Sequence, residues 1–221
     1  AETTLTQLNI LKFYYPLALT SLLTLGIQPF VTFFIGQSRM AIESFAVMPV
    51  VTSLVFIFRA FGLSYQEVVI ALTGDNFINH KSLKSFAVKL AVFSAGSFMI
   101  VAFTPLSEIW FKNVSGLSES LTEFAATPLK IMSFFPVLTV LISFQRAILV
   151  KSKETKQITY GTAIEFIGIM IVVAICIKYF MLVGAIAATI SFVLGRIAAC
   201  VYLMIPAKKS LQLSKSSIQS A

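Results

Sequence analysis

Residues 45–72 read FAVMPVVTSLVFIFRAFGLSYQEVVIAL, and this stretch decides the class of the fold. A hydrocarbon core about 30 Å thick is crossed by roughly 20 apolar residues in a helix, and this run exceeds that length with only Arg59 and Glu67 charged. A membrane β-strand would instead alternate apolar and polar residues over about ten positions. The stretch therefore predicts a membrane-spanning α-helix.

Five further runs have the same character, and they cover residues 13–34, 86–103, 126–150, 158–177 and 183–205. The composition agrees, because 57% of the 221 residues are hydrophobic and 12% are charged, against about 45–50% and about 25% in soluble domains. The sequence predicts an all-α polytopic membrane protein with a six-helix bundle of residues 13–205. A cytoplasmic lead-in of residues 1–12 and a polar cytoplasmic tail of residues 206–221 flank this bundle.

The connectors between the runs differ in their basic content. The tail and the connectors after the second and fourth runs contain Lys81, Lys84, Lys151, Lys153, Lys156, Lys208, Lys209 and Lys215, whereas the other connectors contain Arg39, Lys112 and Lys178. Cytoplasmic loops are enriched in Lys and Arg, so both ends of the chain are predicted to be cytoplasmic, with the bundle in the plasma membrane. The net charge of +8 is a topology signal on this view and does not indicate nucleic-acid binding.

The long connector at residues 105–125 has apolar residues at helix-like spacing, interrupted at residues 113–116. We expect one or two short helices there that lie flat at the membrane surface, with Trp110 at the level of the lipid headgroups.

An enzyme or metal site requires a constellation that this sequence lacks. It contains neither an HExxH zinc motif nor a GxSxG nucleophile motif, and Asp75 is its single aspartate. Cys176 and Cys200 both lie in apolar runs, where cysteine usually acts as a small buried hydrophobe. The sequence therefore predicts no enzyme, no metal site and no cofactor.

Polar side chains at membrane depth are the candidate functional residues. A charged group costs at least about 2.5–3.5 kcal/mol at the centre of a lipid-facing helix, so we expect such residues to face the bundle interior or a wet cavity. Arg59 lies near the middle of its run, Gln66 is nearly in line with it, and Glu67 lies about 80° round the helix. Glu165 and Arg196 lie in the fifth and sixth runs.

Two interpretations of Arg59 stay open from the sequence. Arg59 forms a structural ion pair with Glu67 or Glu165, with Arg196 as a further ion-pairing residue, or it binds a ligand. A guanidinium can bind a carboxylate or phosphate through two parallel hydrogen bonds. Arg146, near the cytoplasmic end of its run, is expected to extend its side chain to the headgroups.

Three prolines, Pro29, Pro49 and Pro136, lie within predicted membrane helices. Each removes a backbone hydrogen bond, and the freed carbonyl must be satisfied within protein or by water. Broken helices with polar residues near the membrane midplane are typical of carriers that rock about a central site. Gln28, which precedes Pro29, is therefore expected to line the cavity.

Four segments carry a resemblance to a known family: FYYPLAL (13–19), FTPLSE (103–108), PLKIMSFFPV (128–137) and VGAIAATIS (183–191). The chain resembles the six-helix half of the multidrug/oligosaccharidyl-lipid/polysaccharide exporter superfamily, which includes the MATE transporters. It is most similar to the C-terminal half of the progressive ankylosis protein family, over most of residues 11–205. Gly62 and Glu67 match a Gly followed by an acid in that family's second helix, whereas Arg59 has no known counterpart there.

The resemblance implies one half of a MATE-like twelve-helix transporter that exports organic anions of the citrate, nucleotide or pyrophosphate class by alternating access. The implied partners are the bilayer, the small-molecule substrate, and a missing N-terminal half or a second copy of the chain. The residues themselves, and not the resemblance, make Arg59 the candidate anion contact, with Glu67 as its partner and with Gln28 and Gln66 lining the site. A coupling ion, Na⁺ or H⁺, stays unassigned.

Three alternative functions stay open from the sequence. Two belong to the same superfamily, namely an ion-coupled exporter of cationic drugs and a flippase for lipid-linked precursors. The third is a membrane scaffold that transports nothing, although a scaffold has no reason to retain charges at membrane depth.

Overall fold

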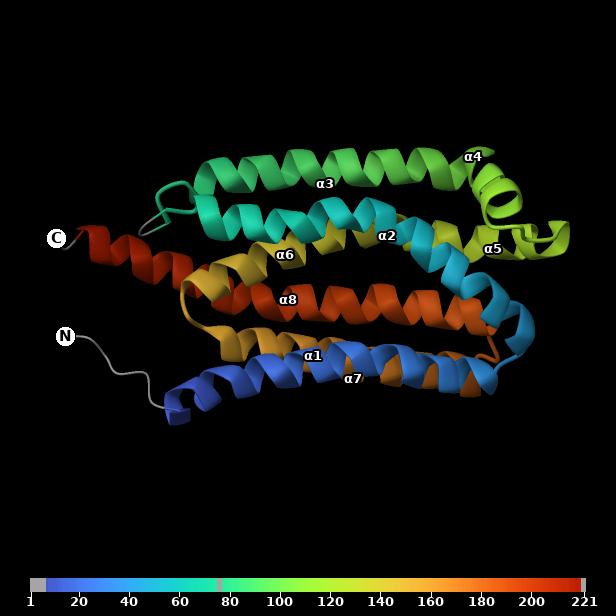
Figure 1. Ribbon diagram of the computed structural model, residues 1–221, viewed down its shortest axis with the longest axis horizontal. Helices are drawn as coiled ribbons and strands as arrows, with labels where there is room; N and C mark the ends of the chain where they lie inside the picture. The colour runs from blue at the N-terminus through green and yellow to red at the C-terminus, as the bar shows by residue number, and fades with distance from the viewer. Residues whose placement is uncertain (1–6, 75–76, 220–221) are drawn as a thin grey trace.

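The computed structural model describes residues 7–74 and 77–219, and these residues contain helices and no strand. The elements are α1 (Gln7–Gly36), α2 (Ala41–Leu72), α3 (His80–Phe103), α4 (Leu106–Glu108), the π-helix η2 (Ile109–Val114), α5 (Glu119–Ile131), the 3₁₀-helix η3 (Met132–Phe134), α6 (Phe135–Lys151), α7 (Thr155–Lys178) and α8 (Gly184–Gln219). Figure 1 shows the long helices side by side, with α4 and α5 at one end of the bundle.

The described part of the chain has six segments that are long and apolar enough to cross a membrane. They are Ala18–Gly36, Ala41–Leu72, His80–Phe103, Glu119–Lys151, Thr155–Lys178 and Gly184–Leu213. The fourth consists of α5, η3 and α6 in continuous succession. The predicted all-α fold with six membrane helices is confirmed, and the chain is an integral membrane protein.

The helices extend beyond several of the predicted runs. α8 continues through residues 206–219, which the sequence predicts to be a polar tail, and α1 begins within the predicted lead-in. The fourth span begins at Glu119, so residues 119–125 are its first turns and not a surface helix. The expected short helix of this connector is limited to α4 and η2, where Trp110 packs half-buried against the bundle core.

The connectors lie at two opposite ends of the bundle. The start of α1 and the end of α8 lie at the same end as the α2–α3 and α6–α7 connections, and the other three connections lie opposite (Figure 1). The connectors that are rich in lysine therefore lie at the same end as the start of α1 and the end of α8, and the connectors with a single basic residue lie at the other end. At the opposite end, Ser44 of α2 accepts a hydrogen bond from the backbone N of Ala185 at 3.0 Å, which joins the α1–α2 and α7–α8 ends.

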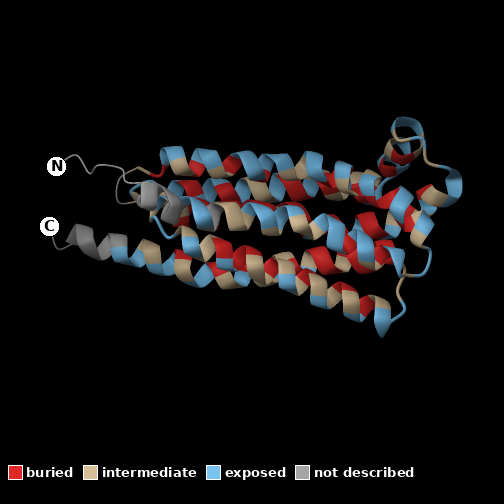
Figure 2. Cartoon of the chain, turned by 60° about the horizontal axis from the view of Figure 1, so that its bottom comes forward, coloured by how far each residue is buried: buried red, intermediate tan, exposed pale blue. Residues whose placement is uncertain are grey.

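The core lies between α6, α8 and the helices packed on them. α7 packs against α8 and α1, whereas α2 and α3 pack against α6. Figure 2 shows buried residues on the facing sides of the helices and exposed residues on the outside. The outer surface carries many large apolar side chains, including Leu25, Phe33 and Ile100, which is expected where hydrocarbon replaces water.

Glycines allow two close helix contacts that matter for the candidate site. A Cβ added at Gly62 of α2 would lie 2.9 Å from the backbone N of Val140 in α6. A Cβ added at Gly195 of α8 would lie 3.0 Å from the backbone O of Glu165 in α7. Small residues at helix contacts let membrane helices approach closely, and here they bring Arg59 close to α6 and Arg196 close to α7.

Candidate functional site

Three arginines from three helices lie near a single buried glutamate, Glu165 of α7. Arg196 of α8 donates from Nε to Glu165 Oε1 at 2.7 Å. Arg146 of α6 has its Nη2 3.9 Å from Glu165 Oε2 and donates to Thr162 Oγ1 at 3.2 Å. Arg59 of α2 joins the group through an aromatic ring that it shares with Arg196. These four charged residues, Arg59, Arg146, Glu165 and Arg196, are called the arginine cluster below.

The shared ring belongs to Phe135, the first residue of α6. The guanidinium carbon of Arg59 lies 4.7 Å from the ring centroid, and that of Arg196 lies 5.0 Å from it. A cation–π contact of this kind contributes about 0.5–2 kcal/mol. Phe135 directly follows the 3₁₀-helix η3, and Pro136 is at the start of α6. The break in the fourth span therefore positions the ring that links the two arginines.

Contacts with α6 and α3 hold the segment around Arg59. Its Nε donates to Thr139 Oγ1 at 3.3 Å, and Thr139 donates in turn to the Phe135 carbonyl at 2.9 Å. On the other side of α2, Ser94 of α3 donates to the carbonyl of Phe58 at 2.7 Å. Hydrogen bonds on two sides therefore hold this part of α2, and the side chain of Arg59 contacts α6 while it remains half-buried.

The predicted ion pair between Arg59 and Glu67 is wrong. No ion pair of Arg59 occurs among the residues that the structure describes, and Glu67 is exposed. The reason is geometric: eight residues separate the two by about 12 Å along the helix axis, and Arg59 turns toward α6. The alternative partner, Glu165, is already paired with Arg196 and Arg146.

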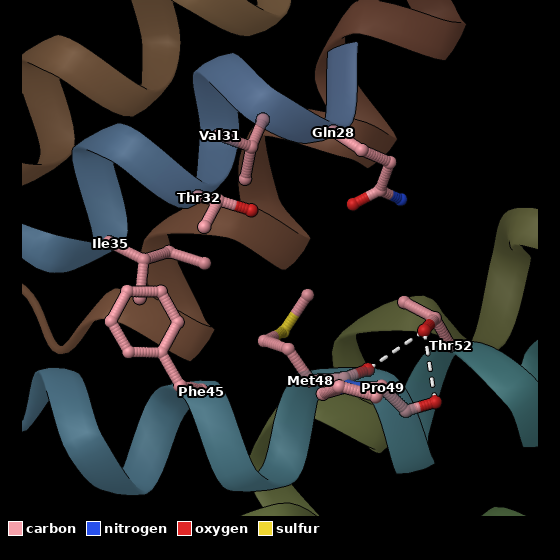
Figure 3. A pocket seen from close by; sticks show the side chains of 8 residues that line it. All are labelled: Gln28, Val31, Thr32, Ile35, Phe45, Met48, Pro49 and Thr52. Carbon is pink, nitrogen blue, oxygen red and sulfur yellow. Dashed lines mark hydrogen bonds between the residues drawn. The ribbon is translucent and has the colours of Figure 1, made fainter. Parts of the chain in front are cut away.

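The remaining predicted site residues lie apart from the cluster. Gln66 is half-buried seven residues after Arg59, on the same face of α2. Gln28 instead lines a pocket between α1 and α2 with a volume of about 240 Å³. Figure 3 shows that its amide extends toward Thr52, which donates to the carbonyls of Met48 at 2.8 Å and Pro49 at 3.1 Å.

This pocket is mostly apolar, and its lining residues are Gln28, Val31, Thr32, Ile35, Phe45, Met48, Pro49 and Thr52. Of the predicted substrate-binding residues it contains only Gln28. Thr52 lies seven residues before Arg59, so one face of α2 carries Thr52, Arg59 and Gln66 in succession. The pocket therefore adjoins the face of α2 that carries Arg59.

Charge in the arginine cluster is not balanced. The cluster contains three guanidiniums and one carboxylate, so it carries two positive charges in excess, and Arg59 has no ion pair among the described residues. The donor Nε of Arg146 is also buried without a hydrogen-bond partner among the described residues. Buried polar groups are nearly always hydrogen-bonded, and a guanidinium binds oxyanions well. The arrangement is chemically suited to an anion.

The cluster borders accessible surface. The side chains of Arg146 and Arg196 are 22% and 12% exposed, whereas that of Glu165 is 4% exposed. The two guanidiniums are therefore partly accessible on the surface of the bundle, while Glu165 forms the buried side of the group.

Sequence analysis missed several members of this site. It predicted that Arg146 extends to the headgroups, but the structure turns it inward to Thr162 and Glu165. Phe135, Thr139 and Arg146 are spaced by four and seven residues, which places them on one face of α6. This spacing was the signal that could have identified them.

A second, larger pocket lies at the opposite end from the chain termini, between α3, η2 and α5, with a volume of about 540 Å³. There Lys112 Nζ lies 2.7 Å from Glu119 Oε1. The hydrogen bond that Lys112 donates to Glu119 is the main factor that raises the pKa of Lys112 above its usual value. Exposed pairs of this kind stabilise proteins little, so this ion pair is part of the surface.

Comparisons of the chain with models of protein families, with curated proteins and with solved structures found no match.

Proposed function

We propose that the chain forms part of a membrane carrier for a small organic anion. The observation that supports this proposal is a cluster of three arginines and one carboxylate within the membrane-spanning helices. Arg146 and Arg196 contact Glu165, and Arg59 joins them through the ring of Phe135. An unbalanced buried charge is expensive to keep. A ligand that supplies the missing negative charge offsets this cost.

The excess positive charge distinguishes this function from the alternatives. A cationic drug would meet repulsion from a cluster that contains three guanidiniums and one carboxylate. A scaffold gains nothing from buried charges that apolar residues could replace at little or no loss of stability. The resemblance to the progressive ankylosis protein family supports the same choice, and it directs the proposal to anions of the citrate, nucleotide or pyrophosphate class.

Alternating access is the mode of transport that we propose. The fourth span is broken at η3, next to Phe135, and α2 and α8 contact their neighbours through glycines. A small change at the break would move Phe135 relative to Arg59 and Arg196. A second six-helix unit, either a missing half or a second copy, completes the pathway in this proposal.

Counterflow in proteoliposomes tests the proposal. Vesicles containing the chain assembled with its second six-helix unit are loaded with unlabelled citrate or pyrophosphate, and uptake of the labelled anion is measured against protein-free vesicles. We expect saturable uptake of at least one of these anions and none of the cation tetraphenylphosphonium. Uptake of the cation alone, or of neither kind of ion, would contradict an anion carrier.

A further inference from the structure

Glu165 occupies the position in the arginine cluster that an incoming oxyanion would take. Its side chain is buried on α7, and its two carboxylate oxygens face arginines from two different helices, Arg196 of α8 and Arg146 of α6. A carboxylate held between guanidiniums has the same chemistry as the anionic group of a substrate. The site therefore already contains an anion that is attached to the protein.

The two contacts of Glu165 are unequal. Arg196 is held at 2.7 Å, whereas the Nη2 of Arg146 is at 3.9 Å and its Nε is buried without a hydrogen-bond partner. Arg196 also shares the ring of Phe135 with Arg59, which has no ion pair within the described residues. Arg196 thus lies between Arg59, which has no ion pair among the described residues, and the carboxylate of Glu165.

We propose that Glu165 is a tethered competitor of the transported anion, an inference that rests on the proposed function. An anion that binds Arg59 and Arg146 takes Arg196 away from Glu165, and Glu165 takes Arg196 back when the anion leaves. The attached carboxylate competes at a high effective concentration. It lowers the affinity for the anion and speeds its release, because without it three guanidiniums would retain the substrate.

If Glu165 competes with the anion, removing its charge should raise the affinity for the anion and lower the turnover. Glu165→Gln keeps the size of the side chain and one acceptor oxygen but removes the competing charge. We expect the dissociation constant of pyrophosphate to fall about tenfold and counterflow turnover to fall with it. A residue that only supports the fold would instead weaken binding when it is changed.

Binding of labelled pyrophosphate to the chain assembled with its second six-helix unit, combined with counterflow in proteoliposomes, tests this inference. The matched control is Glu154→Gln, which changes an exposed glutamate of the α6–α7 connection and should leave both quantities unchanged. Glu165→Asp retains the charge but shortens the side chain, so it should give a dissociation constant between those of the wild type and Glu165→Gln. This variant decides the question if Glu165→Gln does not fold.

The outcomes separate the two proposals. If the wild type binds pyrophosphate and the Glu165 variants bind it equally or more weakly, the competitor role is overturned while the anion carrier stands. If the wild type binds neither pyrophosphate nor citrate, the proposed function fails and this inference fails with it. Tighter binding with slower turnover supports both.

Discussion

Arg196 donates a hydrogen bond to Glu165 at 2.7 Å across the contact between α7 and α8. The neighbouring residue Gly195 makes this contact close, since a Cβ added at Gly168 of α7 would lie 3.5 Å from the Gly195 Cα. The ion pair therefore depends on small residues beside it as well as on its own charges. Four of our predictions follow from this arrangement and from the neighbouring contacts of the cluster.

The close approach at Gly195 can be tested by adding one methyl group. A Cβ there would lie 2.5 Å from Ile169 Cγ1 and 3.0 Å from the backbone O of Glu165, so Gly195→Ala should destabilise the protein by roughly 1–3 kcal/mol through overpacking. Thermal unfolding in detergent measures the change. The control is Gly96→Ala in α3, where no atom lies within 4 Å of the added Cβ. Equal midpoints for the two variants would show that the α7–α8 contact is looser than described.

Replacing Phe135 should lower anion affinity and stability more than replacing its neighbour Phe134. Phe135→Leu removes the ring that contacts Arg59 and Arg196, and we expect weaker anion binding together with a loss of about 1–3 kcal/mol of stability. Phe134→Leu is the matched control, because Phe134 is exposed. Anion affinity and thermal midpoint are measured on the same preparations. If Phe135→Leu matched Phe134→Leu in both, the ring would have no role in the cluster.

Double-mutant cycles should separate the true ion pair from the one predicted from sequence. Arg196→Leu alone leaves a buried carboxylate and should cost about 3–5 kcal/mol, and adding Glu165→Leu should recover much of that loss. Arg59→Leu and Glu67→Leu should instead be additive within about 0.5 kcal/mol, since the two residues form no ion pair. Unfolding free energies give both couplings. Strong coupling between Arg59 and Glu67 would refute the arrangement described for α2.

The number and type of the membrane helices were predictable because an apolar run of about 20 residues has few alternatives. The start of the fourth helix was missed because residues 119–125, ESLTEFA, are too polar to extend an apolar run. Arg59 was recognised at membrane depth, but its contacts were not, because they depend on how α2 is rotated against α6. Gly62 and Thr139 determine that rotation through contacts between residues far apart in the chain. Arg146 was misjudged for the same reason.

The side of the membrane that each connector faces remains a prediction from the basic residues. Single cysteines introduced after replacement of Cys176 and Cys200 can be labelled with an impermeant reagent in intact cells. We expect labelling at Arg39→Cys and Lys178→Cys and none at Glu154→Cys, because the connectors rich in lysine should be cytoplasmic. External labelling at Glu154→Cys would reverse the orientation.

In the proposed carrier, the arginine cluster binds the transported anion through guanidinium geometry and not through charge alone. Arg59→Lys retains the charge but loses the planar donors that bind an oxyanion bidentately. The most direct measurement is an equilibrium binding isotherm of labelled pyrophosphate on the wild type, on Arg59→Lys and on Arg39→Lys, whose change lies in the α1–α2 connection. We expect saturable binding that is weakened about tenfold or more by Arg59→Lys and left unchanged by Arg39→Lys. Equal affinity in all three folded proteins would contradict this expectation.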